Sequence, residues 1–79
     1  MKVITIGPNQ TEIETSTGYT VLYSYSTAVA VFVPGRGGLC TKERHSATTT
    51  RHIKAAIARW GCSRMEVSQD EINQLALKV

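Results

Sequence analysis

The hydrophobic pattern divides the chain into an alternating first half and a helical second half. Residues 2–6 are a short β-prone segment, polar and apolar residues alternate along 11–15 and 19–25, and residues 28–33 are apolar without interruption. Alternation with a period of two is typical of strands that bury one face, whereas an unbroken apolar run is typical of a central strand. Residues 39–44 follow as a more polar strand, expected near a sheet edge. The pattern therefore predicts about five short strands joined by turns.

The strand over 19–25 leaves two interpretations open. Tyr19, Tyr23 and Tyr25 fall on one face of that strand, and Leu22 falls on the other. A row of tyrosines can stack on the bases of a single-stranded nucleic acid. The same row can fill the core beneath a helix, which we favour because so short a chain has only a small core to build. In that case the face of Leu22 is expected to be exposed.

The period changes in the second half and predicts two helices. Apolar residues recur at helical spacing over 53–60. Thr48–Thr50, before this stretch, offer candidate N-caps, and Gly61, directly after it, is a candidate C-terminal stop. Ser68 and Glu71 have the spacing of a capping box, and the apolar residues after them again follow a helical period. Cys62–Glu66 is expected to be the linker between the helices.

These elements predict a single α+β domain over residues 1–79. The expected architecture is a small antiparallel β-meander of about five short strands, followed by two α-helices packed on one face. A chain of 79 residues is too short for a second domain.

Charge is concentrated in the middle of the chain. The net charge is +3, yet residues 34–64 hold seven Lys or Arg against a single Glu. Such a segment favours an anionic partner, either phosphate or an acidic protein surface. The alternative is a solvated basic face that serves solubility alone.

Five basic residues are the candidate partner-binding residues. Arg51, Lys54 and Arg59 are expected on the solvent face of the first helix. Arg44 is expected on the strand before that helix, and Arg36 at the tip of the glycine-rich loop 34–38. Alanines between the helical members would let another chain approach closely while arginines bind carboxylates or phosphates. Because neither Arg51 nor Arg59 points into the expected core, reversing both charges is expected to leave the fold intact.

Other chemistries find little support in the sequence. The gaps between Cys40, His45, His52 and Cys62 match no usual zinc-binding spacing. The chain has no nucleophile elbow, and its glycine-rich loop leads into a strand rather than into a helix N-terminus that could bind phosphate. We therefore expect no catalytic residue, no metal and no cofactor, and hence a protein that is not an enzyme.

The N-terminus and the apolar runs predict a protein of the host-cell cytoplasm. The first residues lack the apolar core of a signal peptide, and the longest strongly apolar run, 28–33, is too short to span a membrane. Both cysteines are accordingly expected to be reduced thiols.

Two segments resemble a known sequence pattern. Tyr23–Ala30 reads Y-S-Y-S-T-A-V-A, and Ser46–Ile53 reads S-A-T-T-T-R-H-I. They are similar to the pattern Y-S-Y-G-T-x-V-A followed by S-x-T-T-x-x-H-I in short uncharacterised plasmid and phage proteins, with Ser26 where glycine is usual. The resemblance implies a mobile-element origin and assigns no activity or site residues.

The sequence is compatible with two functions. The first is a small non-enzymatic protein of a phage or mobile element that binds a host protein or nucleoprotein complex stoichiometrically. It would inhibit nucleic-acid-handling or defence machinery, as anti-CRISPR and anti-restriction proteins do, and one face could supply the ~800 Å² per partner of a standard interface. The second is an accessory protein that binds DNA or RNA directly through its basic middle segment. The absence of a recognisable nucleic-acid-reading motif favours the first, and either function is compatible with a homodimer.

Overall fold

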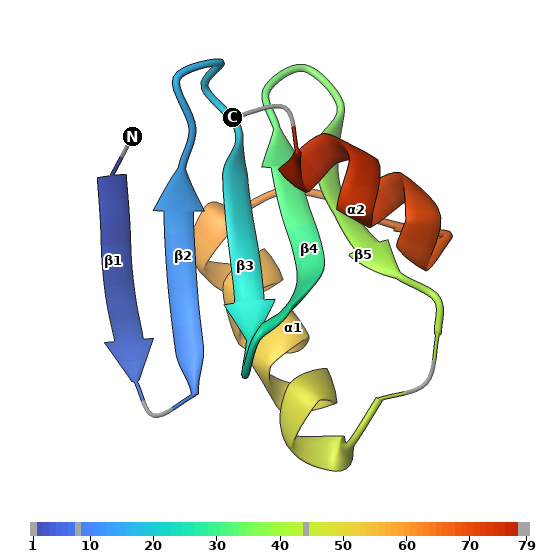
Figure 1. Ribbon diagram of the computed structural model, residues 1–79. Helices are drawn as coiled ribbons and strands as arrows, with labels where there is room; N and C mark the ends of the chain where they lie inside the picture. Colours follow the sequence, from blue (N-terminus) through green and yellow to red (C-terminus); the bar gives the residue numbers. More distant parts are fainter. Residues whose placement is uncertain (1, 8, 44, 78–79) are drawn as a thin grey trace.

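The computed structural model describes residues 2–7, 9–43 and 45–77 and contains one sheet and two helices (Figure 1). The strands are β1 (Lys2–Gly7), β2 (Gln10–Glu14), β3 (Thr20–Ser24), β4 (Thr27–Val33), β5 (Gly37–Thr41) and β6 (Arg64–Val67), and the helices are α1 (Ala47–Trp60) and α2 (Gln69–Ala76). The six strands lie side by side in chain order. Strands β1 to β5 form an antiparallel meander, and β6 runs parallel to β5.

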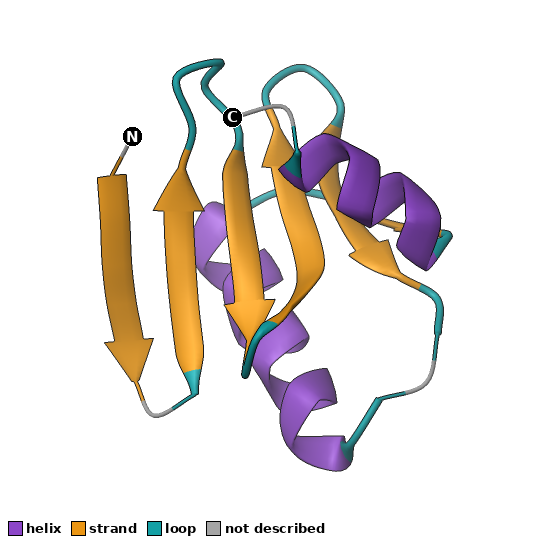
Figure 2. Cartoon of the chain, in the orientation of Figure 1, coloured by secondary structure: helices purple, strands orange, loops and turns teal. Residues whose placement is uncertain are grey.

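The α+β class and the meander followed by two helices are confirmed, but the helices lie on opposite faces of the sheet rather than on one. Figures 1 and 2 show α2 in front of the sheet and α1 behind it. Each helix covers its own core. The α1 core consists of Leu22, Val29, Ala30, Cys40, Ile53 and Ala56. The α2 core consists of Val21, Ala28, Val31, Val33, Leu39, Ile72 and Leu75.

The two cores follow from strands that are apolar on both faces. Along β3, Val21 points to α2 and Leu22 points to α1, and both are at most 1% exposed. The expectation that the face of Leu22 is exposed is therefore wrong. Tyr19 and Tyr23 pack, half-buried, against the α2 core, as the core interpretation of the tyrosines predicted.

The segment expected to be a linker contributes a sixth strand instead. Met65 pairs with Leu39 and Val67 with Thr41 in parallel register. A parallel neighbour requires a crossover, and α1 provides it by carrying the chain from the end of β5 back to the start of β6. Strand β5 consequently lies inside the sheet, not at its edge, and Cys40 is fully buried.

Close packing of this crossover explains one glycine of the loop 34–38. A Cβ atom at Gly38 would lie 2.6 Å from Cδ1 of Ile57 and 2.8 Å from Sγ of Cys62. Gly38 belongs to β5, so only part of the predicted mobile hairpin tip is a turn. This position needs glycine because the end of α1 approaches the strand closely.

Both helices end at defined caps. The N-cap of α1 is Ser46, whose Oγ accepts a hydrogen bond from the N–H of Thr49, rather than one of Thr48–Thr50. Gly61 takes a left-handed conformation (φ 62°) and ends α1, as predicted. Ser68 caps α2 by accepting a hydrogen bond from the N–H of Glu71 at 3.2 Å, which confirms that half of the predicted capping box.

Ser68→Ala should lower the free energy of unfolding by about 1 kcal/mol, because the N–H of Glu71 loses its acceptor. Chemical denaturation followed by circular dichroism measures the change. Ser16→Ala, at an exposed turn residue, is the matched control and should change stability by less than about 0.5 kcal/mol. Equal stability of the two variants would show that the cap contributes nothing.

Candidate partner-binding surface

Helix α1 presents a stripe of exposed residues to solvent. Arg51, Lys54, Ala55 and Ala58 recur at i, i+3, i+4 and i+7, and all four are exposed. This stripe, the α1 outer face, lies opposite the buried residues of the helix, which are Thr49, His52, Ile53 and Ala56. The helical period alone thus placed Arg51 and Lys54 on the solvent side, in agreement with the sequence-based expectation.

The two cations of the α1 outer face have no carboxylate partner among the described residues. Arg51 donates a long hydrogen bond, 3.5 Å, to Oγ1 of Thr48 one turn earlier, and Lys54 projects into solvent. Two small side chains, Ala55 and Ala58, separate these cations from the end of the helix. Such a surface can accept carboxylates or phosphates of a second molecule without first breaking an internal ion pair.

Arg59 has a different role from the one expected. Its guanidinium pairs with the carboxylate of Glu12 on β2, and Glu12 is only 6% exposed. The sequence-based expectation placed Arg59 on the solvent face of the first helix. A buried carboxylate requires a partner because removing it from water is costly, so Arg59 supports the fold.

Of the remaining two candidates, Arg36 does not join the α1 outer face. Arg36 lies on the β4–β5 turn, with Nη2 at 3.6 Å from Oε2 of Glu71 on α2. Because α2 covers the other face of the sheet, Arg36 is separated from the α1 outer face by the sheet itself (Figure 1). Arg44 lies outside the described residues. The predicted basic face is therefore divided: among the four candidates that the structure describes, Arg51 and Lys54 share one surface.

The two segments with the resemblance meet in space. Oγ of Ser24 lies 2.9 Å from Oγ1 of Thr49 and 2.8 Å from Nδ1 of His52. These three residues, the motif cluster, are all buried and tie the end of β3 to α1. Ser24 is only 2% exposed, so this serine–histidine contact gives a substrate no access to the hydroxyl. The motif cluster thus joins one residue of the first segment to two residues of the second.

Tyr25 is a surface residue that sequence reasoning misplaced. It begins the two-residue turn between β3 and β4, with φ 58°, and leaves the strand face of Tyr23. Its N–H donates a hydrogen bond to the carbonyl of Asn9 at 2.7 Å, and its ring lies 6.4 Å from the ring of His52. With 55% of its surface exposed, Tyr25 adds an aromatic contact residue beside α1.

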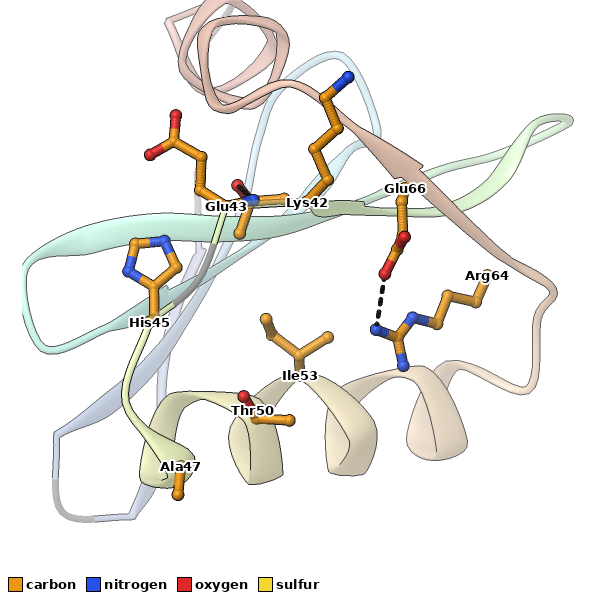
Figure 3. A pocket seen from close by; sticks show the side chains of 9 residues that line it. Lys42, Glu43, His45, Ala47, Thr50, Ile53, Arg64 and Glu66 are labelled. Carbon is orange, nitrogen blue, oxygen red and sulfur yellow. Dashed lines mark hydrogen bonds and ion pairs between the residues drawn. The ribbon is translucent and has the colours of Figure 1, made fainter.

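A groove of about 430 Å³ opens between β5, β6 and the first turns of α1 (Figure 3). Figure 3 shows Thr50 and Ile53 pointing into it from α1, with Arg64 and Glu66 joined at 3.2 Å on the other side. Its lining is of mixed charge and comprises Thr41, Lys42, Glu43, His45, Ala47, Thr50, Ile53, Arg64 and Glu66. Acidic and basic groups offset each other here, so the groove does not favour an anion on its own.

Arg64 links this groove to the buried thiol of β5. A hydrogen bond and the charge interaction with Cys40 raise the pKa of Arg64 above its ordinary value, and Glu66 adds to the effect, while burial opposes it. The Arg64 guanidinium itself is exposed at the sheet edge and is cationic, as arginine is in proteins generally. Cys40 and Cys62 are both free thiols.

No metal or membrane site emerges from the described part of the chain. Within residues 2–7, 9–43 and 45–77, no three His, Cys, Asp or Glu side chains gather closely enough to hold a metal ion. No helix in that part has the length and apolar character needed to cross a membrane.

Comparison with known proteins gives one match. A family model, described as a family of unknown function (DUF8033), matches residues 1–74. The chain belongs to DUF8033. The region shared with DUF8033 includes the whole sheet, the motif cluster and the α1 outer face. No curated protein and no solved structure matches the chain.

Proposed function

We propose that this DUF8033 protein is a small non-enzymatic binding protein that acts stoichiometrically on an acidic macromolecular partner through the α1 outer face. The observation that supports this proposal is the contrast among its cations. Arg51 and Lys54 have no carboxylate partner among the described residues, whereas Arg36 and Arg59 are held by Glu71 and Glu12. Free cations beside small side chains suit a flat acidic surface that approaches closely.

A protein partner is favoured over nucleic acid by the number of free cations. Direct binding to DNA or RNA draws its affinity from many simultaneous phosphate contacts. Two of the candidate arginines are neutralised by ion pairs, and in the groove beside α1 the carboxylates of Glu43 and Glu66 offset the cations of Lys42 and Arg64. A protein surface rich in Asp and Glu needs fewer cations, arranged around a closely packed centre.

The biological role proposed is inhibition of host nucleic-acid-handling or defence machinery, in the manner of anti-CRISPR or anti-restriction proteins. Its support is the resemblance of the two motif segments to plasmid and phage proteins. Such a protein would act in the cytoplasm of the host cell. Direct nucleic-acid binding is the second candidate, supported by the exposed ring of Tyr25 beside α1, since bases stack on such rings.

The double variant Arg51→Glu/Lys54→Glu should weaken partner binding by roughly 30-fold or more, because two attractive charges become repulsive. Affinity capture from host lysate, with and without nuclease, identifies the partner, and titration calorimetry of the purified pair then measures the affinity. Arg36→Glu/Lys42→Glu makes the same change in net charge at exposed basic residues away from the stripe and should bind normally. Equal weakening in both double variants would remove the α1 outer face from the mechanism.

Salt dependence separates the two candidate functions. If nucleic acid is the direct ligand, all captured partners are lost after nuclease treatment, and log affinity falls by roughly 0.7–0.9 per phosphate contact for each decade of salt. A protein complex with a buried centre survives nuclease and loses mainly association rate as salt rises.

A further inference from the structure

The sheet has two edges of different character. Strand β6 is four residues long, and its exposed Arg64 and Glu66 are charged. Strand β1 is six residues long and has Lys2 as its single charge, with Val3, Ile4 and Ile6 among the other residues. Short length and alternating charges protect an edge from pairing with another strand, whereas a longer apolar edge presents free N–H and C=O groups as a template.

An in-register apolar row ends at this unprotected edge. Val3, Ile13, Val21, Val31, Leu39 and Met65 are aligned across all six strands on the α2 side of the sheet. The residues from β3 to β5 are at most 1% exposed beneath α2. At the β1 end, Val3 remains 62% exposed. Met65, at the β6 end, is 50% exposed but lies between the charged Arg64 and Glu66, whereas Val3 is followed by Ile4, so a further strand would extend the row favourably at β1.

Neither helix covers β1. Among the described residues, both cores are built from β3, β4, β5 and the helices, and neither contains a residue of β1. The side chains of β1 are apolar on both faces, because Val3 lies on the α2 side and Ile4 on the α1 side. This pattern is typical of a strand that is covered on both faces, yet neither core reaches β1, which has β2 as its one neighbour in the described sheet.

We propose that β1 pairs antiparallel with β1 of a second copy of this chain, which joins two six-stranded sheets about a two-fold axis. The second copy is favoured by the charges of the strand. In an antiparallel register centred on Ile4, each Lys2 lies opposite Ile6 of the other copy, and in one centred on Val3 it lies opposite Ile4. The two lysines therefore face no like charge, and each keeps its own cross-strand neighbour Glu14. The residue at the axis, Val3 or Ile4, packs against its own symmetry mate, as a two-fold interface requires.

The size of this contact predicts a reversible dimer. The β1–β2 register is regular from Lys2 to Thr5 and is interrupted by an irregularity between Thr5 and Gly7, so the pairing segment is short. A contact of this length buries less than the ~800 Å² per partner of a standard interface, so we expect a dissociation constant in the micromolar range or weaker. The dimer would carry two α1 outer faces, and a partner with two acidic sites would then bind with higher avidity.

Sedimentation velocity over a range of protein concentrations tests the pairing on the full chain. The wild-type protein should shift from monomer to dimer as concentration rises. Val3→Glu should shift the equilibrium at least about 10-fold toward monomer, because it places two carboxylates near the axis. Met65→Glu is the matched control, since Met65 ends the same row at the opposite edge and is 50% exposed, and it should dimerise like the wild type. A wild-type protein that stays monomeric at millimolar concentration, or a dimer lost in Met65→Glu but kept in Val3→Glu, would overturn the proposal.

Cross-linking supplies a second readout that does not depend on the stability of Val3→Glu. Val3→Cys and Ile4→Cys are each combined with Cys62→Ser. Each new thiol lies next to its symmetry mate, within disulfide range, in the register that is centred on that residue. Mild oxidation should link one of these variants into a covalent dimer and should leave Met65→Cys in the same background unlinked. Failure of both β1 variants to cross-link, or equal cross-linking of the Met65 variant, counts against β1 as the interface. Since neither assay involves a partner protein, its outcome is independent of the proposed function.

Discussion

Leu22→Ala should lower the free energy of unfolding by about 3 kcal/mol, because it removes a fully buried side chain from the centre of the α1 core. Leu22 packs in a core that includes Val29, Ile53 and Ala56, and its strand is held between neighbours on both sides. The surrounding backbone therefore cannot close the cavity that the alanine would leave. Equilibrium denaturation in urea measures the loss, which is a large share of the stability of so small a domain.

Leu77→Ala is the control, because it makes the same leucine-to-alanine truncation at an exposed position. Leu77 is 80% exposed, so the same truncation should alter stability by less than about 0.5 kcal/mol. A Leu22→Ala variant that unfolds at the same urea concentration as Leu77→Ala would show that α1 does not cover this face of the sheet. The pair of variants thus distinguishes a sheet covered on both faces from one covered on a single face.

Local periodicity was sufficient to predict most elements of the fold. Alternation along 19–25 and the unbroken run over 28–33 predicted strands, and the stop at Gly61 and the cap at Ser68 lie where the sequence placed them. Periodicity does not specify which face of a sheet a helix covers, since that depends on the path of the chain between elements. The parallel strand β6 is the clearest example, because its pairing with β5 exists only once α1 has brought the chain back across the sheet.

The candidate site shows the same division between local and long-range information. The orientation of Arg51 and Lys54 follows from the helical period, which the sequence displays directly. The partners of the other arginines are distant in sequence, since Glu12 lies 47 positions before Arg59, and no local pattern reveals such a pair. Tyr25 was misplaced for a further reason: a two-residue turn begins at that position and removes it from the strand period.

Arg59→Glu should lower the free energy of unfolding by about 2–3 kcal/mol, whereas Arg51→Glu should change it by less than about 0.5 kcal/mol. The physical reason is Glu12, which is 6% exposed and would lose its cation and face a second carboxylate. The expected loss is below that of a fully buried pair because the side chain of Arg59 is 36% exposed to water. Both variants replace an arginine of α1 by glutamate, so they change the net charge equally. Thermal and urea denaturation of the two variants measures the difference in stability.

A double-mutant cycle identifies the ion pair as the cause. Arg59→Met leaves Glu12 without a partner and should be destabilising, and adding Glu12→Gln removes the buried charge and should recover part of the loss. If Arg59→Glu is as stable as Arg51→Glu, the pair contributes nothing and Arg59 returns to the candidate binding surface. If Arg59→Glu is less stable than Arg51→Glu, weaker partner binding in an Arg59 variant is explained by the altered fold. Charge reversal at Arg51 and Lys54 is then the informative change for binding, in place of the Arg51 and Arg59 pair suggested by the sequence alone.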